Sequence, residues 1–231
     1  MKLFFERIWG VIRSSWSLLR VLPQWIVGTW KLMRLKRPIV TVFGGKRLGN
    51  ASMYEKLAFE MGQKLVTANI SVITGGGPGV MRAANCGAAA ASNGAIRSMG
   101  IGVNGLNIDE PVNECVQEYQ LTDYFAVRKH FLTFYSSGFI IFPGGFGTLD
   151  ELFEILVLMQ TNKRPEAPIV LVGRAYWEPL LSWVEKSVKE GFVPQVHADF
   201  ITITDDIDEA LAQMVMTCKK VRRLPMGKTV S

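Results

Sequence analysis

Residues 143–151 read PGGFGTLDE and combine a glycine-rich turn with two adjacent carboxylates. Glycine lets backbone N–H groups approach an anion closely, and the N-terminus of a following helix adds partial positive charge. Thr148 is a good N-cap residue, and Asp150 and Glu151 would then lie in the first helical turn, where acids are stabilised. Capping alone would explain both acids. Because Glu151 also lies beside the predicted anion site, its carboxylate could instead orient or activate water.

Glycines also end two other predicted strands. One group is Gly44 and Gly45, and the other is the stretch GGGPG at residues 75–79. Ligands of open parallel α/β sheets bind at the carboxyl ends of the strands. One such loop is as consistent with a tight turn as with a phosphate site. Three in one sheet favour a phosphate-bearing ligand.

A predicted helix at residues 124–137 carries Arg128, Lys129 and His130 in succession. Arg128 could clamp a phosphate or stabilise developing negative charge, or it could form an ordinary surface salt bridge. His130 and His197 have no metal-ligand spacing, so the sequence predicts no metal site.

The ligand is not expected to be a dinucleotide. The first strand ends GGKRLG at residues 44–49, which lacks the G-x-G-x-x-G pattern. The second loop has Val80 where the third glycine would fall, and no acid follows about twenty residues later. The P-loop signature G-K-[ST] is also missing.

Short β-branched runs alternate with helical patterns from Pro38 onward, which predicts βαβ units around a parallel sheet. Right-handed crossovers would place helices on both faces. The expected fold is therefore a doubly wound, Rossmann-like α/β domain. The predicted strands are residues 38–45, 70–74, 96–103, 116–122, 138–142, 168–172 and 200–204. The predicted helices are residues 51–69, 78–91, 124–137, 148–162, 176–190 and 207–219.

The two ends of the chain are basic. Residues 1–37 carry eight basic residues and one acid, residues 219–231 carry five basic residues and no acid, and the middle is mildly acidic. A uniformly basic nucleic-acid-binding body is therefore disfavoured. Wound as a helix, residues 2–22 place charged side chains on one side and apolar ones on the other. Such a helix could lie on an anionic membrane surface, or pack on its own body or across a dimer.

Composition narrows the class of protein further. The chain is 48% hydrophobic and 20% charged, which excludes global disorder, a collagen-like repeat and a polytopic membrane protein. The longest uncharged run near the N-terminus, residues 21–30, is too short to span a bilayer. Cys86, Cys115 and Cys218 lie far apart in sequence, so we expect neither a disulfide scaffold nor structural zinc. A reducing compartment is the simplest interpretation.

The body resembles the LOG ("lonely guy") family, long mislabelled as lysine decarboxylases. The family pattern P-G-G-x-G-T-x-x-E is complete at residues 143–151, and GGGPGVMRAAN at 75–85 and DYFAVRKHF at 123–131 match its other motifs. The resemblance spans roughly residues 38–218. It implies a Rossmann-like, dimeric phosphoribohydrolase that needs no cofactor. Such enzymes split cytokinin riboside monophosphates or AMP into free base and ribose 5-phosphate.

The resemblance assigns roles to particular residues. Arg128 and Glu151 match the catalytic pair, and the transition state would be oxocarbenium-like, as in glycoside hydrolysis. Arg82 stands where bacterial members often have Glu, and the first strand ends in Phe43-Gly44-Gly45-Lys46, which puts the base preference in doubt. The expected substrate and phosphate contacts are Gly45, Gly75, Gly76, Gly77, Gly79, Lys129, Gly144, Gly145, Gly147, Thr148 and Asp150.

Two other functions compete with hydrolysis. Related proteins with this fold carry molybdenum cofactor, so the same pocket could bind a nucleotide or that cofactor without cleaving it. A membrane-associated scaffold acting through residues 1–37 is the other alternative. We expect a basic helical extension at 1–37, the family domain at 38–218 and a basic tail at 219–231. A nucleoside monophosphate and a second copy of the chain are the expected partners, without nucleic acid. The expected location is the cytoplasm, with the inner face of a membrane as an alternative.

Overall fold

The computed structural model describes residues 2–46, 52–105 and 111–223 of the chain. Within these ranges, none of the helices combines the length and the hydropathy needed to cross a membrane. The glycine at position 49 and residues 224–231 of the predicted basic tail lie outside the described residues.

The centre of the body is one sheet of seven strands, with every neighbouring pair parallel. The order β4-β3-β2-β1-β5-β6-β7 runs outward in both directions from β1, so the chain reverses its winding between β1 and β5. This arrangement confirms the predicted doubly wound α/β fold. The strands are β1 (Ile39–Phe43), β2 (Ser71–Thr74), β3 (Ser98–Val103), β4 (Glu118–Thr122), β5 (Gly138–Ile141), β6 (Ile169–Val172) and β7 (Ile201–Thr204).

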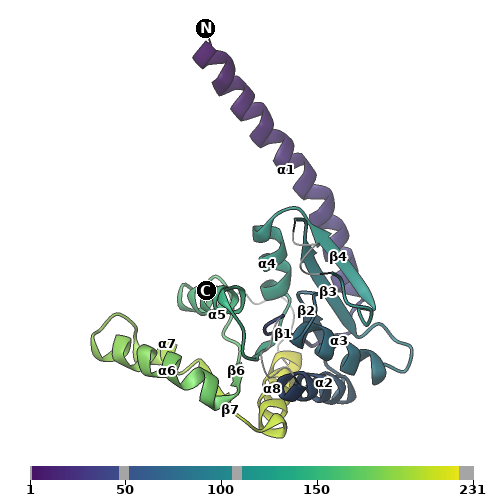
Figure 1. Cartoon of the computed structure of the whole chain (residues 1–231), viewed down its shortest axis with the longest axis vertical. Coiled ribbons are helices and arrows are strands. Elements are labelled where there is room, and N and C mark those ends of the chain that lie inside the picture. Colours follow the sequence, from purple (N-terminus) through teal and green to yellow (C-terminus); the bar gives the residue numbers. More distant parts are fainter. Residues whose placement is uncertain (1, 47–51, 106–110, 224–231) are drawn as a thin grey trace.

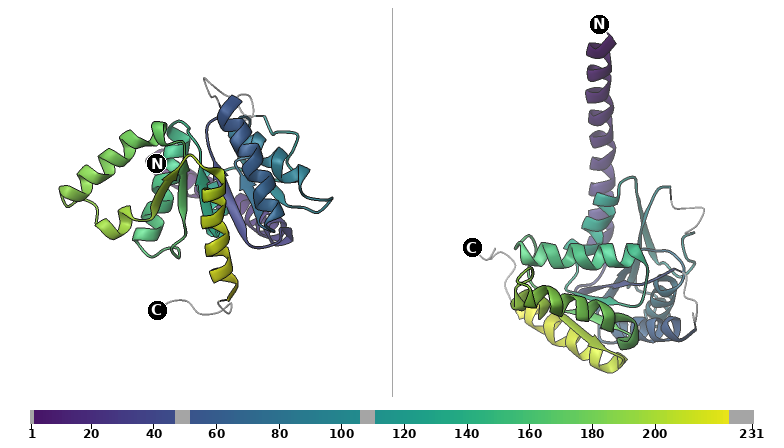
Figure 2. Two further views of the ribbon diagram at one scale, coloured as in Figure 1. Left: turned by 90° about the horizontal axis from the view of Figure 1, so that it is seen from below. Right: turned by 60° about the vertical axis from the view of Figure 1, so that its left-hand side comes forward.

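Helices cover both faces of the sheet (Figure 1, Figure 2). In β1, Val40 and Val42 point to a core shared with α2, α3 and α8, whereas Ile39 and Phe43 point to a core shared with α1, α4, α5 and α6. This alternation is the period of two expected for a strand buried on both sides. The helices are α1 (Lys2–Arg34), α2 (Ser52–Thr67), α3 (Val80–Ala90), α4 (Phe125–Phe134), α5 (Phe146–Gln160), α6 (Arg174–Lys189), α7 (Gln195–Ala198) and α8 (Ile207–Arg223).

Some element boundaries differ from the sequence prediction. The short helix α7 was not predicted, and α8 continues to Arg223, into the segment expected to be a tail. Helix α5 begins at Phe146, with Gly145 as its N-cap and no side-chain cap. The predicted N-cap role of Thr148 is therefore wrong, because the helix starts inside the glycine-rich stretch. The first turn of α5 therefore contains no acid, and Asp150 and Glu151 lie beyond it.

The C-terminal part of α1 packs on the body beside β4 and α4. Leu32 is buried in the core, and Gln24 donates a hydrogen bond to the Asp123 carboxylate at 2.5 Å. Lys31 donates to the Tyr119 carbonyl at 2.5 Å. The N-terminal part of α1 extends away from the body (Figure 1, Figure 2). One helix therefore has a segment anchored on the sheet and a segment that projects beyond it.

Candidate active site at the carboxyl end of the sheet

Three glycine loops meet at the carboxyl ends of β1, β2 and β5. These strands are neighbours because β1 pairs with both of the others. The Gly45 amide donates to the Pro143 carbonyl at 2.9 Å, and the Val80 amide donates to the Gly45 carbonyl at 3.3 Å. The loop after β1 thus hydrogen-bonds to the loops after β5 and β2. The structure places them at the winding reversal, where ligands of doubly wound sheets bind.

The loop at residues 75–79 is buried and held by side chains. The Thr74 hydroxyl accepts from the Gly76 amide at 3.0 Å and donates to the Asn85 side-chain oxygen at 2.6 Å. The Asn113 side-chain amide donates to the carbonyls of Gly76 and Gly77 at 2.9 and 3.0 Å. Sequence reasoning did not identify Asn85 or Asn113, because no motif shows that their segments meet at this loop.

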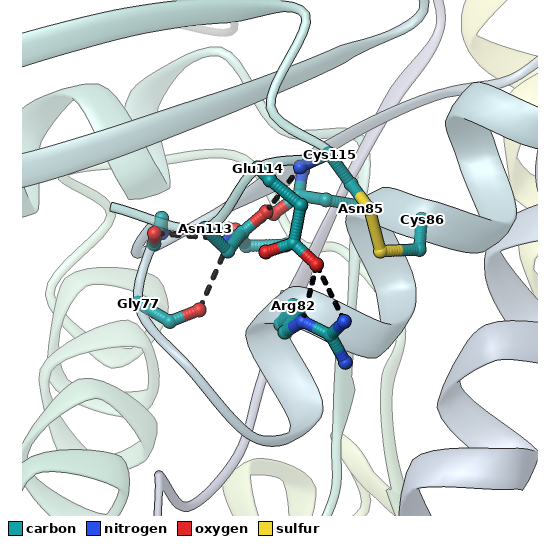
Figure 3. The surroundings of a disulfide bond; sticks show 9 residues. Gly77, Arg82, Asn85, Cys86, Asn113, Glu114 and Cys115 are labelled. Carbon is teal, nitrogen blue, oxygen red and sulfur yellow. Dashed lines mark hydrogen bonds and ion pairs between the residues drawn. A yellow bond between two sulfur atoms is a disulfide. The ribbon is translucent and has the colours of Figure 1, made fainter. Parts of the chain in front are cut away.

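A disulfide between Cys86 and Cys115 fastens the Asn113 segment to α3 (Figure 3). The two Cα atoms are 4.8 Å apart although 29 positions separate the cysteines in sequence. Arg82 of α3 reaches the Glu114 carboxylate with its Nε at 2.8 Å, so α3 and this segment also share an ion pair. Sequence spacing did not indicate this single disulfide, because the fold brings together segments that lie apart along the chain.

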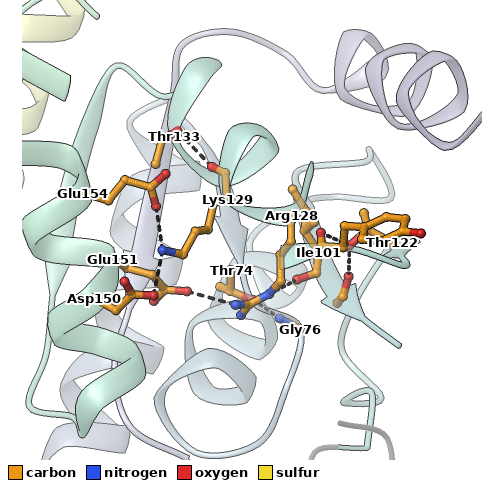
Figure 4. Close-up of polar contacts among 12 residues, drawn as sticks. Thr74, Gly76, Ile101, Thr122, Arg128, Lys129, Thr133, Asp150, Glu151 and Glu154 are labelled. Atoms are coloured by element: carbon orange, nitrogen blue, oxygen red, sulfur yellow. Dashed lines mark hydrogen bonds and ion pairs between the residues drawn. The ribbon is translucent and has the colours of Figure 1, made fainter. Parts of the chain in front are cut away.

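Arg128 of α4 lies at the centre of the candidate site (Figure 4). Its Nε donates to the Ile101 carbonyl at 3.0 Å, and its Nη1 donates to the Glu151 carboxylate at 3.2 Å. Both side chains are buried, so this contact is not the surface salt bridge that sequence analysis left open. A Cβ atom on Gly75 would lie only 2.5 Å from Arg128 Nη2, so glycine at this position makes room for the guanidinium.

Glu151 has a shifted acidity. Burial raises the pKa of the Glu151 carboxyl to about 7 from its usual 4.5, against the opposing effect of Arg128. A carboxyl with this pKa exchanges its proton near neutral pH, as a general acid or base must. The position of Glu151 one turn inside α5 fixes the carboxylate opposite Arg128.

Lys129 belongs to a neighbouring ion-pair cluster. Its Nζ lies 2.7 Å from Asp150 and 3.2 Å from Glu154, both on α5 (Figure 4). Burial lowers the pKa of Lys129, but its hydrogen bonds to these two carboxylates outweigh burial and leave the pKa raised. The structure therefore joins α4 to α5 through the buried Arg128–Glu151 pair and the partly exposed contacts of Lys129 with Asp150 and Glu154.

The loop at residues 144–147 differs from the loop at 75–79. Gly145 and Gly147 are exposed, and a Cβ atom added to either would meet nothing within 4 Å. Thr148 is buried, and a Cβ atom on Gly144 would collide with its hydroxyl oxygen. The start of α5 thus presents backbone N–H groups beside an open surface, the arrangement that binds anions.

Tyr119 is a further residue that sequence reasoning missed. Its ring packs over Gly76 and Gly100, and its hydroxyl lies against Gly102. Burial raises the pKa of the Tyr119 hydroxyl, while the nearby Arg128 opposes that shift. Because these glycines have no side chains, the half-buried ring of Tyr119 can lie next to the 75–79 loop and near Arg128.

The predicted site residues therefore lie in two neighbouring ion pairs and in the three glycine loops around them. Arg128 and Glu151 pair directly, Lys129 and Asp150 pair next to them, and Gly45 joins the two longer glycine loops. The predicted loop contacts lie around this centre: Gly75, Gly76, Gly77 and Gly79 after β2, and Gly144, Gly145, Gly147 and Thr148 at the start of α5.

Solved structures with a similar fold include two proteins named for the molybdenum cofactor. The molybdenum cofactor carrier protein of Chlamydomonas reinhardtii has a TM-score of 0.59 at 21% identity, covering 79% of this chain and 98% of that one. The molybdenum cofactor binding protein of Rippkaea orientalis has a TM-score of 0.57 at 22% identity, covering 81% and 98%. At these identities the likeness shows the fold alone.

Sequence comparisons identify the family. The family described as "Possible lysine decarboxylase" matches residues 81–214. Cytokinin riboside 5′-monophosphate phosphoribohydrolase LOG1 of Arabidopsis thaliana is 34% identical over 155 residues, which cover 67% of this chain and 71% of that protein. The probable phosphoribohydrolase LOGL2 of Oryza sativa subsp. japonica is also 34% identical over 155 residues, and the match spans only 62% of that rice protein. The chain therefore belongs to the possible lysine decarboxylase family, which is the LOG family.

Proposed function

We propose that this protein hydrolyses the N-glycosidic bond of a nucleoside 5′-monophosphate, releasing the free base and ribose 5-phosphate. The observation that carries the proposal is the buried contact of Arg128 with Glu151, beside an exposed glycine loop at a helix N-terminus. The raised pKa of Glu151, about 7, supports a role in proton transfer. The names of the relatives support the same reaction class.

The 5′-phosphate would bind at the start of α5. Backbone N–H groups of Gly145 and Gly147 lie at an exposed helix N-terminus, where partial positive charge favours an anion. Lys129 lies near this end of the helix, where Asp150 and Glu154 hold its ammonium group in place. Holding the phosphate away from the reacting bond positions the ribose and uses remote binding energy for the chemical step.

The chemical step would take place at C1′ of the ribose. The bond from C1′ to the base nitrogen breaks, and the sugar develops oxocarbenium character. The Glu151 carboxylate stabilises that charge and guides a water molecule to C1′. The water oxygen bonds to C1′ and loses one proton to Glu151. The departing base nitrogen takes up a proton from solvent, and Glu151 then releases its own proton to solvent. Arg128, fixed by the Ile101 carbonyl, holds Glu151 in place.

The proposed substrates are cytokinin riboside monophosphates or AMP. The first follows from the names of the relatives, which act on cytokinin riboside 5′-monophosphates. Arg82 stands where bacterial relatives often have Glu, and it pairs with Glu114 near the 75–79 loop. Because this difference lies beside the proposed pocket, the preferred base has to be measured by comparing nucleotides directly.

Base release tests the proposal. The purified full-length protein is incubated with AMP, GMP, CMP, UMP and isopentenyladenosine monophosphate, and free base is resolved by chromatography. We expect release from at least one of them and a loss of about a thousandfold in Glu151→Gln, because the variant lacks the carboxylate charge and its proton exchange. Glu185→Gln is the matched control, since Glu185 is an exposed glutamate on α6.

Two outcomes would contradict hydrolysis. Unchanged release in Glu151→Gln would remove the proposed role of the carboxylate. Tight binding of a nucleotide without release of any base would favour a carrier, and binding of molybdenum cofactor would then be measured directly.

A further inference from the structure

Helix α1 has two apolar sides. One side, with Trp25, Gly28 and Leu32, packs against the body, and a Cβ atom on Gly28 would collide with Phe131. The opposite side carries an outer stripe of apolar residues three or four positions apart, which places them in one line along the helix. The outer stripe consists of Leu19, Leu22, Ile26, Trp30 and Met33, which are 64%, 60%, 60%, 60% and 72% exposed.

The outer stripe needs a binding partner outside the folded body. Single exposed apolar residues are normal on a protein surface, but a contiguous row of large ones marks an interaction site. The body already occupies the other side of the helix, so it cannot cover the outer stripe as well. Trp9, further along the projecting segment, is 70% exposed.

The charge of α1 indicates the kind of partner. The helix contains six basic residues and one acid, Glu6. Lys31 and Arg34 pair with Glu118 of the body, whereas Arg7 and Arg20 are exposed on the projecting part of the helix. Two copies of α1 packed against each other would bring like charges together. An anionic surface would complement them, and tryptophan is favoured at membrane–water interfaces.

The geometry also suits a flat surface. Thirty-three residues make a helix about 50 Å long, and it extends past the body along one direction (Figure 2). Because the body packs on the side opposite the outer stripe, the helix can lie on a plane while the body stays on the far side. Among the described residues no helix can cross a membrane, so contact would be interfacial.

We propose that α1 docks the protein on an anionic lipid surface through the outer stripe, with the body on the solvent side. The test is sedimentation of full-length protein with vesicles. One vesicle is phosphatidylcholine alone, and the other is an equimolar mixture of phosphatidylcholine and phosphatidylglycerol. We expect binding to the mixed vesicles that weakens as salt is raised, and weak binding to phosphatidylcholine alone.

A double variant in the outer stripe tests the surface itself. Leu22→Asp combined with Ile26→Asp should reduce binding to mixed vesicles by at least about tenfold, because two apolar side chains no longer leave water. Both positions are exposed, so the change does not touch the core, and circular dichroism checks the helix. The matched control is Phe192→Asp with Val196→Asp, which are 76% and 58% exposed near α7. This region borders β7, the sheet edge opposite the one against which α1 packs.

A second pair of variants tests the charge. Arg7→Gln with Arg20→Gln should weaken binding by about fivefold for each arginine. Lys163→Gln with Lys189→Gln removes the same charge from exposed positions elsewhere and should leave binding unchanged.

The results separate the membrane from a second copy of the chain. Vesicle binding that is equal in the outer-stripe variant and the wild type would overturn the proposal. Light scattering without lipid supplies the other arm. An oligomer that dissociates in the outer-stripe variant, with no vesicle binding by the wild type, would assign the stripe to contact between copies and would also overturn it. An assembly unchanged by the variant, together with lost vesicle binding, supports it.

Discussion

The glycine loop at residues 75–79 is buried and braced by side chains, whereas the loop at 144–147 is largely exposed. Both follow parallel strands and meet at the same edge of the sheet. The first is held by Thr74 and Asn113 and packs against the guanidinium of Arg128. The second ends in a helix N-terminus without a side-chain cap.

The comparison shows that glycine serves two different purposes in one site. At Gly75 it permits a close approach, because any Cβ atom would collide with Arg128 and Met81. Gly76 and Gly79 have φ values of 77° and 68°, which residues other than glycine rarely adopt. At Gly145 and Gly147 space is free, so glycine leaves the backbone open to a ligand. We infer that the first loop positions the arginine and the second binds the anion.

Among substitutions within the two loops, the largest effect on turnover is expected from Gly75→Ala. The added methyl group would lie 2.5 Å from Arg128 Nη2 and 2.7 Å from Met81 Sδ, so the guanidinium must shift from the position in which it contacts Glu151. A displacement of this kind costs about a hundredfold in turnover. The measurement is kcat for base release, with thermal unfolding to show that the variant is folded. Turnover within twofold of wild type in a folded variant would contradict the inference that the 75–79 loop positions Arg128.

The pH dependence of kcat tests the role of Glu151, which pairs with Arg128 between the two loops. Because burial raises the pKa of Glu151 to about 7, and the proposed step uses the ionised carboxylate, kcat should rise with pH and level off above 7. Below that pKa it should fall about tenfold for each unit of pH. The profile is measured with a substrate that shows base release. Turnover that instead falls as pH rises through 7 would mean that the protonated carboxyl is the active form.

Stability should follow the opposite course with pH. The folded protein binds the Glu151 proton more tightly than the unfolded chain, whose carboxyl has its usual pKa of 4.5. The stabilisation from the protonated group is complete below pH 4.5 and is lost as pH rises to about 7. That loss amounts to at most about 3 kcal/mol of unfolding free energy. Urea unfolding measured at a series of pH values gives the unfolding free energy as a function of pH. Glu151→Gln should remove the decrease in that free energy between pH 4.5 and 7.

Asn113→Ala should loosen the braced loop. The variant removes the side-chain donor to the Gly76 and Gly77 carbonyls, although the backbone amide of residue 113 still donates to Gly76. A buried carbonyl left without its donor costs about 2 kcal/mol of unfolding free energy, which urea unfolding measures. Asn104→Ala is the control: this exposed asparagine donates to the Asp123 carboxylate in contact with solvent, where water can replace the donor, so the change should cost less than about 0.5 kcal/mol. Equal costs for the two variants would contradict the bracing role.

The division between the loops also marks the limit of sequence reasoning. The β-branched runs and glycine-rich strand ends predicted the parallel sheet, and the motifs predicted which helices carry Arg128 and Glu151. Thr148 was misplaced, because a helix start within a glycine-rich stretch depends on backbone hydrogen bonds rather than on residue type. Asn113 and the Cys86–Cys115 disulfide could not be predicted, because their contacts join segments about thirty residues apart.

The smallest change in stability is expected from Gly147→Ala. Position 147 lies in the first turn of α5, and a Cβ atom there would meet nothing within 4 Å. Alanine should therefore raise the unfolding free energy slightly, by less than about 1 kcal/mol, because it favours a helix over glycine. If a phosphate lies against this backbone, the methyl group would raise KM about tenfold with little change in kcat. Ser182→Ala, at an exposed position in α6, is the matched control and should leave KM unchanged. An unchanged KM in Gly147→Ala would show that the phosphate does not bind at the loop of residues 144–147. Both glycine loops would then have only a structural role.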